Sequence, residues 1–260
     1  MTGPEFASCW LKIERAEEHF NTFYAELREW NETNPYSLVF KPDPEGRRHG
    51  IVANINGLPN FKRWALITGD CIHNLRSALD HLVYALAIRD NGGPVADAKA
   101  IRSIQFPIGS DAMEFEKAAS RVAALKPGTK TAIERIQSYN RFNPPLPLLL
   151  PVLRELDNAD KHRTLTLALN HVAGFRIQFD PPLLTGMPKF NLLGTAVYSG
   201  AEVVFFFLDP PDLNVSYQCY MEFAVTVAHA PGSTGKHVSV LDHLLTGLIA
   251  EVKSIVAGSF

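Results

Sequence analysis

The sequence predicts an α+β protein, with a helical bundle followed by an antiparallel β-sheet and a C-terminal helix. Apolar residues recur every three or four positions through much of the first 163 residues, which is the period of amphipathic helices. After Arg163 the chain changes to runs rich in Val, Phe, Thr and Tyr, separated by Pro, Gly, Asn and Asp, a pattern typical of antiparallel strands. Helical spacing returns over 239–256, which predicts the closing helix.

The N-terminal third predicts two helices with a hairpin between them. Apolar residues at helical spacing predict a helix over 5–30, with Pro4 in its first turn. Two β-prone runs, 36–40 and 50–55, flank a group of turn formers and predict a hairpin. The central helix is expected from Asn60 to Ala87, before the stop signal Asp-Asn-Gly-Gly-Pro.

Shorter elements are expected before the sheet. Residues 104–108 predict an extended piece, and Asp111 is the expected N-cap of a helix over 112–125. Lys-Pro-Gly then separates that helix from another over 131–139. The last helix of the bundle is expected over 148–163.

The second half predicts strands, the most apolar of which, 203–207, belongs at the centre of the sheet. The expected strands are 164–170, 174–179, 196–208 and 217–229. We therefore divide the chain into a mainly helical part, 1–163, which carries the hairpin at 36–56, and a strand-rich part, 164–260. We expect the two to pack as one unit.

Composition narrows the classes of function. The formal net charge of −2 gives no global reason to bind nucleic acid or an anionic membrane. The three cysteines are far apart and form no C-x-x-C, which favours a reducing cytoplasm, with Cys71 as a packing residue. No signal peptide or membrane span is expected. We expect the basic cluster Arg47 to His49 to be a solvated hairpin edge, with a phosphate contact as the alternative.

The densest polar pattern lies on the central helix, over 69–84. One side of this helix is apolar, and the other carries residue types that form sites or buried networks instead of the usual Lys, Glu and Gln. The polar side consists of Asp70, His73, Asn74, Arg76, Ser77, Asp80, His81 and Tyr84.

A second polar cluster closes the helix over 148–163. It consists of Asp157, Asn158, Asp160, Lys161, His162 and Arg163. Asp160 and Arg163 continue the apolar stripe of that helix, so they should point towards neighbouring helices. We expect the polar side of 69–84 to face this cluster.

Three interpretations of the two clusters stay open, and the first is a metal site. His73 and Asp80 are seven residues apart, within roughly 20° of each other around a helix. Asp157, Asp160 or His162 from the facing helix could complete a mixed nitrogen and oxygen ligand set, with His73, Asp80, Asp160 and His162 as the candidate ligands. The corresponding function is a metal-dependent hydrolase.

The second interpretation is the function that we expect from the sequence, with the other two as alternatives: binding or metal-independent cleavage of RNA or a nucleotide. Arg76 to His81 reads R-polar-x-x-x-H, which resembles the signature of the HEPN superfamily of helical ribonucleases and nucleotide-binding proteins. The resemblance implies that His81 moves the proton of a ribose 2′-hydroxyl and that Arg76 stabilises charge on the phosphate. Arg76, Asp80 and His81 are then the candidate catalytic residues. A homodimer stays open as an assembly, and the sequence leaves the cofactor unknown.

The third interpretation is a structural network in a non-enzymatic interaction module. Buried Asp, Arg and His must be paired, and Asp160 with Arg163 would match Asp80 and Arg76 as partners across the helix interface.

A wider resemblance covers most of the chain. Gly-Asp-x-x-His-Asn-Leu-Arg-Ser-Ala-Leu-Asp-His-Leu-Val at 69–83, Phe106-Pro107-Ile108, and Asn158-x-Asp160-Lys161-His162-Arg163 before a β-rich tail are similar to a family of bacterial proteins with no assigned activity. The resemblance implies that both clusters belong to one unit. It implies no reaction type.

Overall fold

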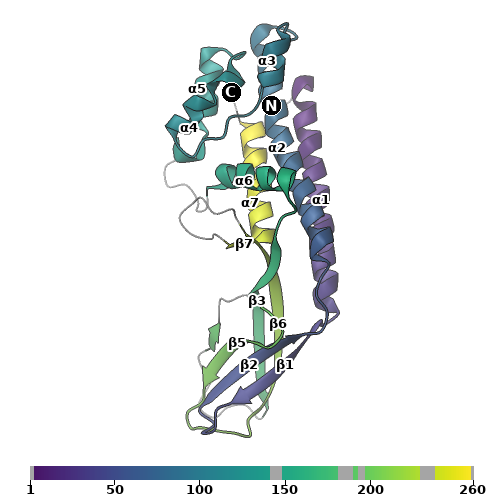
Figure 1. The fold of residues 1–260 in the computed structure, drawn as a ribbon, viewed down its shortest axis with the longest axis vertical. Coiled ribbons are helices and arrows are strands. Elements are labelled where there is room, and N and C mark those ends of the chain that lie inside the picture. Colours follow the sequence, from purple (N-terminus) through teal and green to yellow (C-terminus); the bar gives the residue numbers. More distant parts are fainter. Residues whose placement is uncertain (1–2, 141–147, 181–189, 193–196, 229–237, 259–260) are drawn as a thin grey trace.

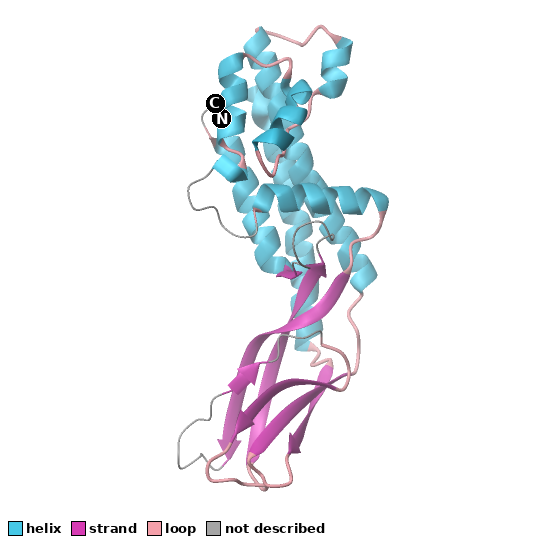
Figure 2. Ribbon diagram, turned by 60° about the vertical axis from the view of Figure 1, so that its left-hand side comes forward, coloured by secondary structure: helices cyan, strands magenta, loops and turns pink. Residues whose placement is uncertain are grey.

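The structure is a computed structural model that describes residues 3–140, 148–180, 190–192, 197–228 and 238–258. The molecule is elongated, with most helices at one end and the strands at the other (Figures 1 and 2). This confirms the predicted α+β class. The buried apolar residues of both ends belong to one continuous cluster.

Four long helices form as predicted, and the helix expected to close the chain packs into the bundle with the other three. The two longest, α1 and α2, lie side by side and run towards the strands (Figure 1). Their bounds and those of the two helices that pack on them are α1 Ala7–Glu32, α2 Phe61–Asn91, α6 Leu149–His162 and α7 Leu241–Ala257. A short 3-10 helix that begins at Pro4 precedes α1, in agreement with the sequence.

The ends of α2 follow from side-chain and backbone chemistry. Asn60 caps the first turn, because its side chain accepts a hydrogen bond from the Arg63 N–H (3.1 Å). Gly92 ends the helix in the left-handed region (φ 69°), which favours glycine. The helix therefore runs four residues beyond the predicted end at Ala87.

The segment between α2 and α6 differs most from the prediction. A helix forms at α3 Ala98–Ser103, where none was expected, and none of its residues is buried. Asp111 is the N-cap as predicted, but α4 Ala112–Lys117 is short and a 3-10 turn at Ala119–Val122 replaces the rest of the expected helix. The next helix, α5 Pro127–Arg135, begins at the proline that was expected to separate helices, because proline suits a first helical turn.

The strands form two antiparallel sheets. The first has the order β1-β2-β5-β4, and the second has the order β3-β6-β7. Their bounds are β1 Tyr36–Pro42, β2 Arg48–Ile55, β3 Leu167–Asp180, β4 Phe190–Leu192, β5 Ala201–Phe207, β6 Ser216–Ala228 and β7 Val238–Val240.

Two features of the sheets correct the sequence-based picture. The two strands expected over 164–170 and 174–179 are one strand, β3, whose pairing with β6 shifts register twice. The predicted hairpin forms, but β2 also pairs with β5, so the hairpin extends a sheet made with the C-terminal half. The predicted central position of 203–207 is confirmed, since β5 lies between β2 and β4.

The expected basic edge of the hairpin is only partly exposed. His49 is buried between the sheets, where its ring stacks on Phe206 (5.3 Å between centroids) and its Nε2 lies 3.2 Å from the Gly46 carbonyl. Arg48 forms an ion pair with Glu202 (2.6 Å). The solvated edge is therefore wrong for His49, because β2 lies between β1 and β5 and is buried continuously from His49 to Ala53. Of the helices in the described part of the chain, none combines the length and apolar character needed to cross a membrane.

One tyrosine joins the two sheets where they approach the helices. The Tyr36 hydroxyl on β1 donates to the Met221 carbonyl on β6 and accepts from the Met221 N–H (3.1 Å). Its ring packs edge-on against Phe223 (5.0 Å between centroids). The hydroxyl thus satisfies a backbone position of β6 that a neighbouring strand would otherwise satisfy.

We predict that Tyr36→Phe lowers the free energy of unfolding by about 1–3 kcal/mol, because it leaves the Met221 backbone groups without their partner. Chemical denaturation measures this loss. Tyr198→Phe, at a side chain that is mostly exposed, is the matched control and should change little. Equal stability of both variants would contradict the role of the Tyr36 hydroxyl.

Candidate functional site

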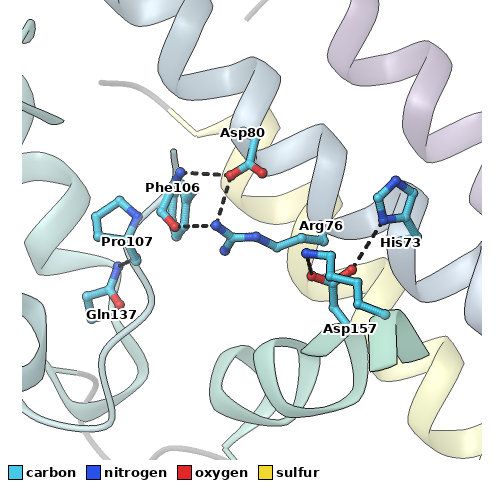
Figure 3. Close-up of polar contacts among 8 residues, drawn as sticks. His73, Arg76, Asp80, Phe106, Pro107, Gln137 and Asp157 are labelled. Carbon is cyan, nitrogen blue, oxygen red and sulfur yellow. Dashed lines mark hydrogen bonds and ion pairs between the residues drawn. The ribbon is translucent and has the colours of Figure 1, made fainter. Parts of the chain in front are cut away.

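Two charged side chains of α2 bind the backbone of a single residue. Arg76 and Asp80 lie one helical turn apart and form an ion pair (2.9 Å). The Arg76 guanidinium donates to the Phe106 carbonyl (2.7 Å), and the Asp80 carboxylate accepts from the Phe106 N–H (2.8 Å). Figure 3 shows both contacts converging on Phe106. The pair therefore satisfies the donor and the acceptor of one peptide segment, as a neighbouring strand would.

The residues that follow Phe106 are held in the same way. Gln137 donates to the Pro107 carbonyl (3.0 Å) and accepts from the Gly109 N–H (3.1 Å). Arg154 on α6 donates to the Ile108 carbonyl (2.8 Å). The segment from Phe106 to Gly109 lies outside any helix or strand, so these side chains supply its hydrogen bonds. We call this segment with Arg76, Asp80, Gln137 and Arg154 the backbone clamp.

Burial shifts the pKa values of Arg76 and Asp80, the charged pair that α2 contributes to the clamp. Burial lowers the pKa of Arg76 and raises the pKa of Asp80, and the attraction between the two opposes both shifts. Buried charges of this kind are tolerated because each satisfies the other and because both bind the Phe106 backbone. The Arg76 guanidinium is consequently engaged on two sides and almost inaccessible to solvent.

A second contact joins α2 to α6. The Asp157 carboxylate is 3% exposed and lies 3.3 Å from Nδ1 of His73, while its other oxygen accepts from Lys161 (2.6 Å). His73 is 54% exposed, so its ring extends from the interface into solvent (Figure 3). The predicted facing of the two clusters is therefore confirmed at His73, whereas Arg76 and Asp80 bind Phe106 instead.

Close approach of the same helices occurs at Gly69. A Cβ at this position would lie 2.3 Å from the Asp160 carboxylate, so any larger residue would force that carboxylate to move. Burial raises the pKa of Asp160, and the neighbouring carboxylates of Asp70 and Asp157 raise it further. Asn74, in contrast, binds α1, because its side chain accepts from Lys12 (3.2 Å).

The structure corrects one predicted pairing. We expected Asp160 and Arg163 to pair with Arg76 and Asp80 across the helix interface, but these two α2 residues bind the Phe106 backbone instead. Arg163 is exposed, because α6 ends at the residue before it and the chain then leaves the interface. Sequence reasoning missed Gln137 and Arg154. The wider resemblance did group Phe106-Pro107-Ile108 with the two polar clusters, and this was the available signal that the segment belongs to the site.

The other residues that were predicted for the site are not part of the clamp. Among the described residues no hydrogen bond or ion pair reaches the side chains of Asn158, His162 or Arg163, all of which are exposed, nor that of His81, which is half-buried. Cys71 is fully buried, as predicted for a packing residue.

The described residues do not support the predicted metal ligands as a set. No group of three or more His, Cys, Asp or Glu in the described ranges is arranged to hold a metal ion. Asp80 is occupied by Arg76 and Phe106, and His73 by Asp157.

No protein-family model, curated protein or solved structure matches the chain.

We predict that Arg76→Met lowers the free energy of unfolding by about 3–5 kcal/mol, because it removes a buried cation and leaves the partly buried Asp80 carboxylate without its partner. Adding Asp80→Asn should restore part of this loss, since the amide is neutral and can still accept from Phe106. Arg163→Met removes an exposed cation and should change stability by less than about 0.5 kcal/mol. A loss in Arg76→Met as small as in this control, measured by denaturant unfolding, would rule out the clamp.

We also predict a pH-dependent effect of Asp160→Asn. The pKa of Asp160 is raised in the folded state, so protonation of this side chain stabilises the fold. This contribution to the free energy of unfolding is present below the unfolded pKa of 3.8 and is lost as the pH rises through the folded pKa. The melting temperature of the variant relative to the original chain should therefore be higher at pH 7 than at pH 3.5. Glu116→Gln, at an exposed carboxyl on α4, is the control; the same pH trend in both variants would contradict the prediction.

Proposed function

We propose that this chain is a non-enzymatic interaction protein in which the polar side chains of α2 and α6 fix the arrangement of the helices. The observation that carries the proposal is the engagement of Arg76 and Asp80 with the Phe106 backbone. A catalytic arginine needs donors free to meet the charge that develops in a transition state. The buried guanidinium of Arg76 already binds two acceptors, which supports a structural role.

A second candidate function is the HEPN-like binding or cleavage of RNA or a nucleotide without a metal. The observation that favours it is the His73–Asp157 contact, in which a buried carboxylate holds Nδ1 of a half-exposed imidazole. Such an arrangement leaves Nε2 free for proton transfer. Lys161, on the same carboxylate, supplies a cation beside it. In this second candidate, His73 takes the central place predicted for Arg76. His81 is still expected to move the proton of the ribose 2′-hydroxyl.

One assay separates the non-enzymatic candidate from the cleavage activity of the second candidate. Purified protein is incubated with single-stranded RNA and, separately, with ATP, in buffer containing EDTA. The original chain is compared with His73→Ala, His81→Ala and the matched control His162→Ala, which removes an exposed histidine of α6. For a non-enzymatic protein we expect no cleavage and no difference among the four chains.

Cleavage that depends on His73 or His81 is the result that would contradict the first proposal. EDTA-resistant cleavage that falls by about 100-fold or more in His73→Ala or His81→Ala, while His162→Ala keeps it, would overturn the non-enzymatic proposal in favour of acid–base catalysis. Melting curves of each variant establish that a lost activity does not reflect unfolding.

A further inference from the structure

A hollow opens where the end of α1 meets β1 and β6. It has a volume of about 490 Å³, within the range of small-molecule sites. Its lining comes from the last two turns of α1, from the start of β1, from the middle of β6 and from Asp242 at the start of α7. None of these residues belongs to the backbone clamp or to the contact between His73 and Asp157.

Aromatic side chains with exposed surface line this hollow. Tyr24 of α1 is 46% exposed and Tyr220 of β6 is 62% exposed. Large exposed tyrosines in a concave region are typical of recognition surfaces, because their rings provide contact area at a low cost in side-chain entropy. The faces of such rings attract cations.

The charge of the lining is negative. Its one arginine, Arg28, is paired with Glu32 one turn along α1 (3.4 Å). Glu222 makes no ion pair within the described part of the chain, and the acid Asp242 has only the neighbouring His243, at 4.0 Å. Arg176 lies in the adjoining hollow beside Glu222 but forms no ion pair with it. Among the described residues, two carboxylates of the lining thus have no Lys or Arg partner.

We propose that the hollow binds a small organic cation with several N–H donors, of the polyamine class. The tyrosine faces, together with two carboxylates that have no Lys or Arg partner among the described residues, favour a cationic ligand and disfavour phosphate or carboxylate ligands. The volume suits a small molecule. The same chemistry could be offered by a lysine side chain of a peptide, so the test includes both sources. The inference does not depend on the proposed function.

Isothermal titration calorimetry with spermidine tests the proposal on the full chain. We expect saturable binding that weakens as NaCl is raised, because exposed charges are screened. Glu222→Gln and Tyr220→Ala should each weaken binding by about tenfold, in line with the loss of one charge-assisted contact or one cation–π contact. Glu14→Gln and Tyr198→Ala change exposed residues outside the hollow and should bind as the original chain does.

Three further probes complete the test. Triethylene glycol and inorganic phosphate should not bind; equal binding of either would overturn the proposal. A tetralysine peptide that binds more tightly than spermidine, and loses affinity in the same two variants, would keep the cation site and assign it to a peptide side chain. Absence of saturable binding for every cation, or affinities unchanged in Glu222→Gln and Tyr220→Ala, would overturn it.

Discussion

The arrangement of the helical end depends on how the backbone of Phe106 to Gly109 obtains its hydrogen bonds. The segment is buried at Phe106 and Ile108, yet it has no strand beside it. An unsatisfied buried peptide group is costly, so side chains from three directions take the place of a strand. Arg76 and Asp80 come from α2, Gln137 follows α5, and Arg154 comes from α6. One short segment thereby ties together helices that are far apart in the chain.

This constraint also explains why the polar residues of α2 could be interpreted as a candidate active site. Arginine, aspartate and glutamine form directional hydrogen bonds, and both active sites and buried backbone segments need such bonds. The spacing of Arg76 and Asp80 places them on the same side of α2, which suits a reacting phosphate and a peptide group equally well. The amino acids alone could not distinguish these partners, because in this structure the partner is main chain.

The long elements were predictable because burial imposes a strong period on them. α1, α2, α6 and α7 each bury a stripe of apolar residues, and the predicted ranges differ from the observed ones by a few residues. α3 buries nothing, so its sequence carries no such period. The pairing of β2 with β5 joins segments almost 150 residues apart, and no local pattern encodes it. The contact of His73 with Asp157 was anticipated as a facing of two clusters, but not as an atomic pair.

The distant partner of the hairpin has a consequence for the order of folding. β1 and β2 can pair as soon as both have left the ribosome, and α1 can pack on α2 after residue 91. β2 keeps an unpaired edge until β5 emerges more than a hundred residues later. Late, non-local pairing of this kind slows folding and leaves a strand edge open to other chains. The strand end should thus be the last part to become protected from hydrogen exchange during refolding, after the α1–α2 pair.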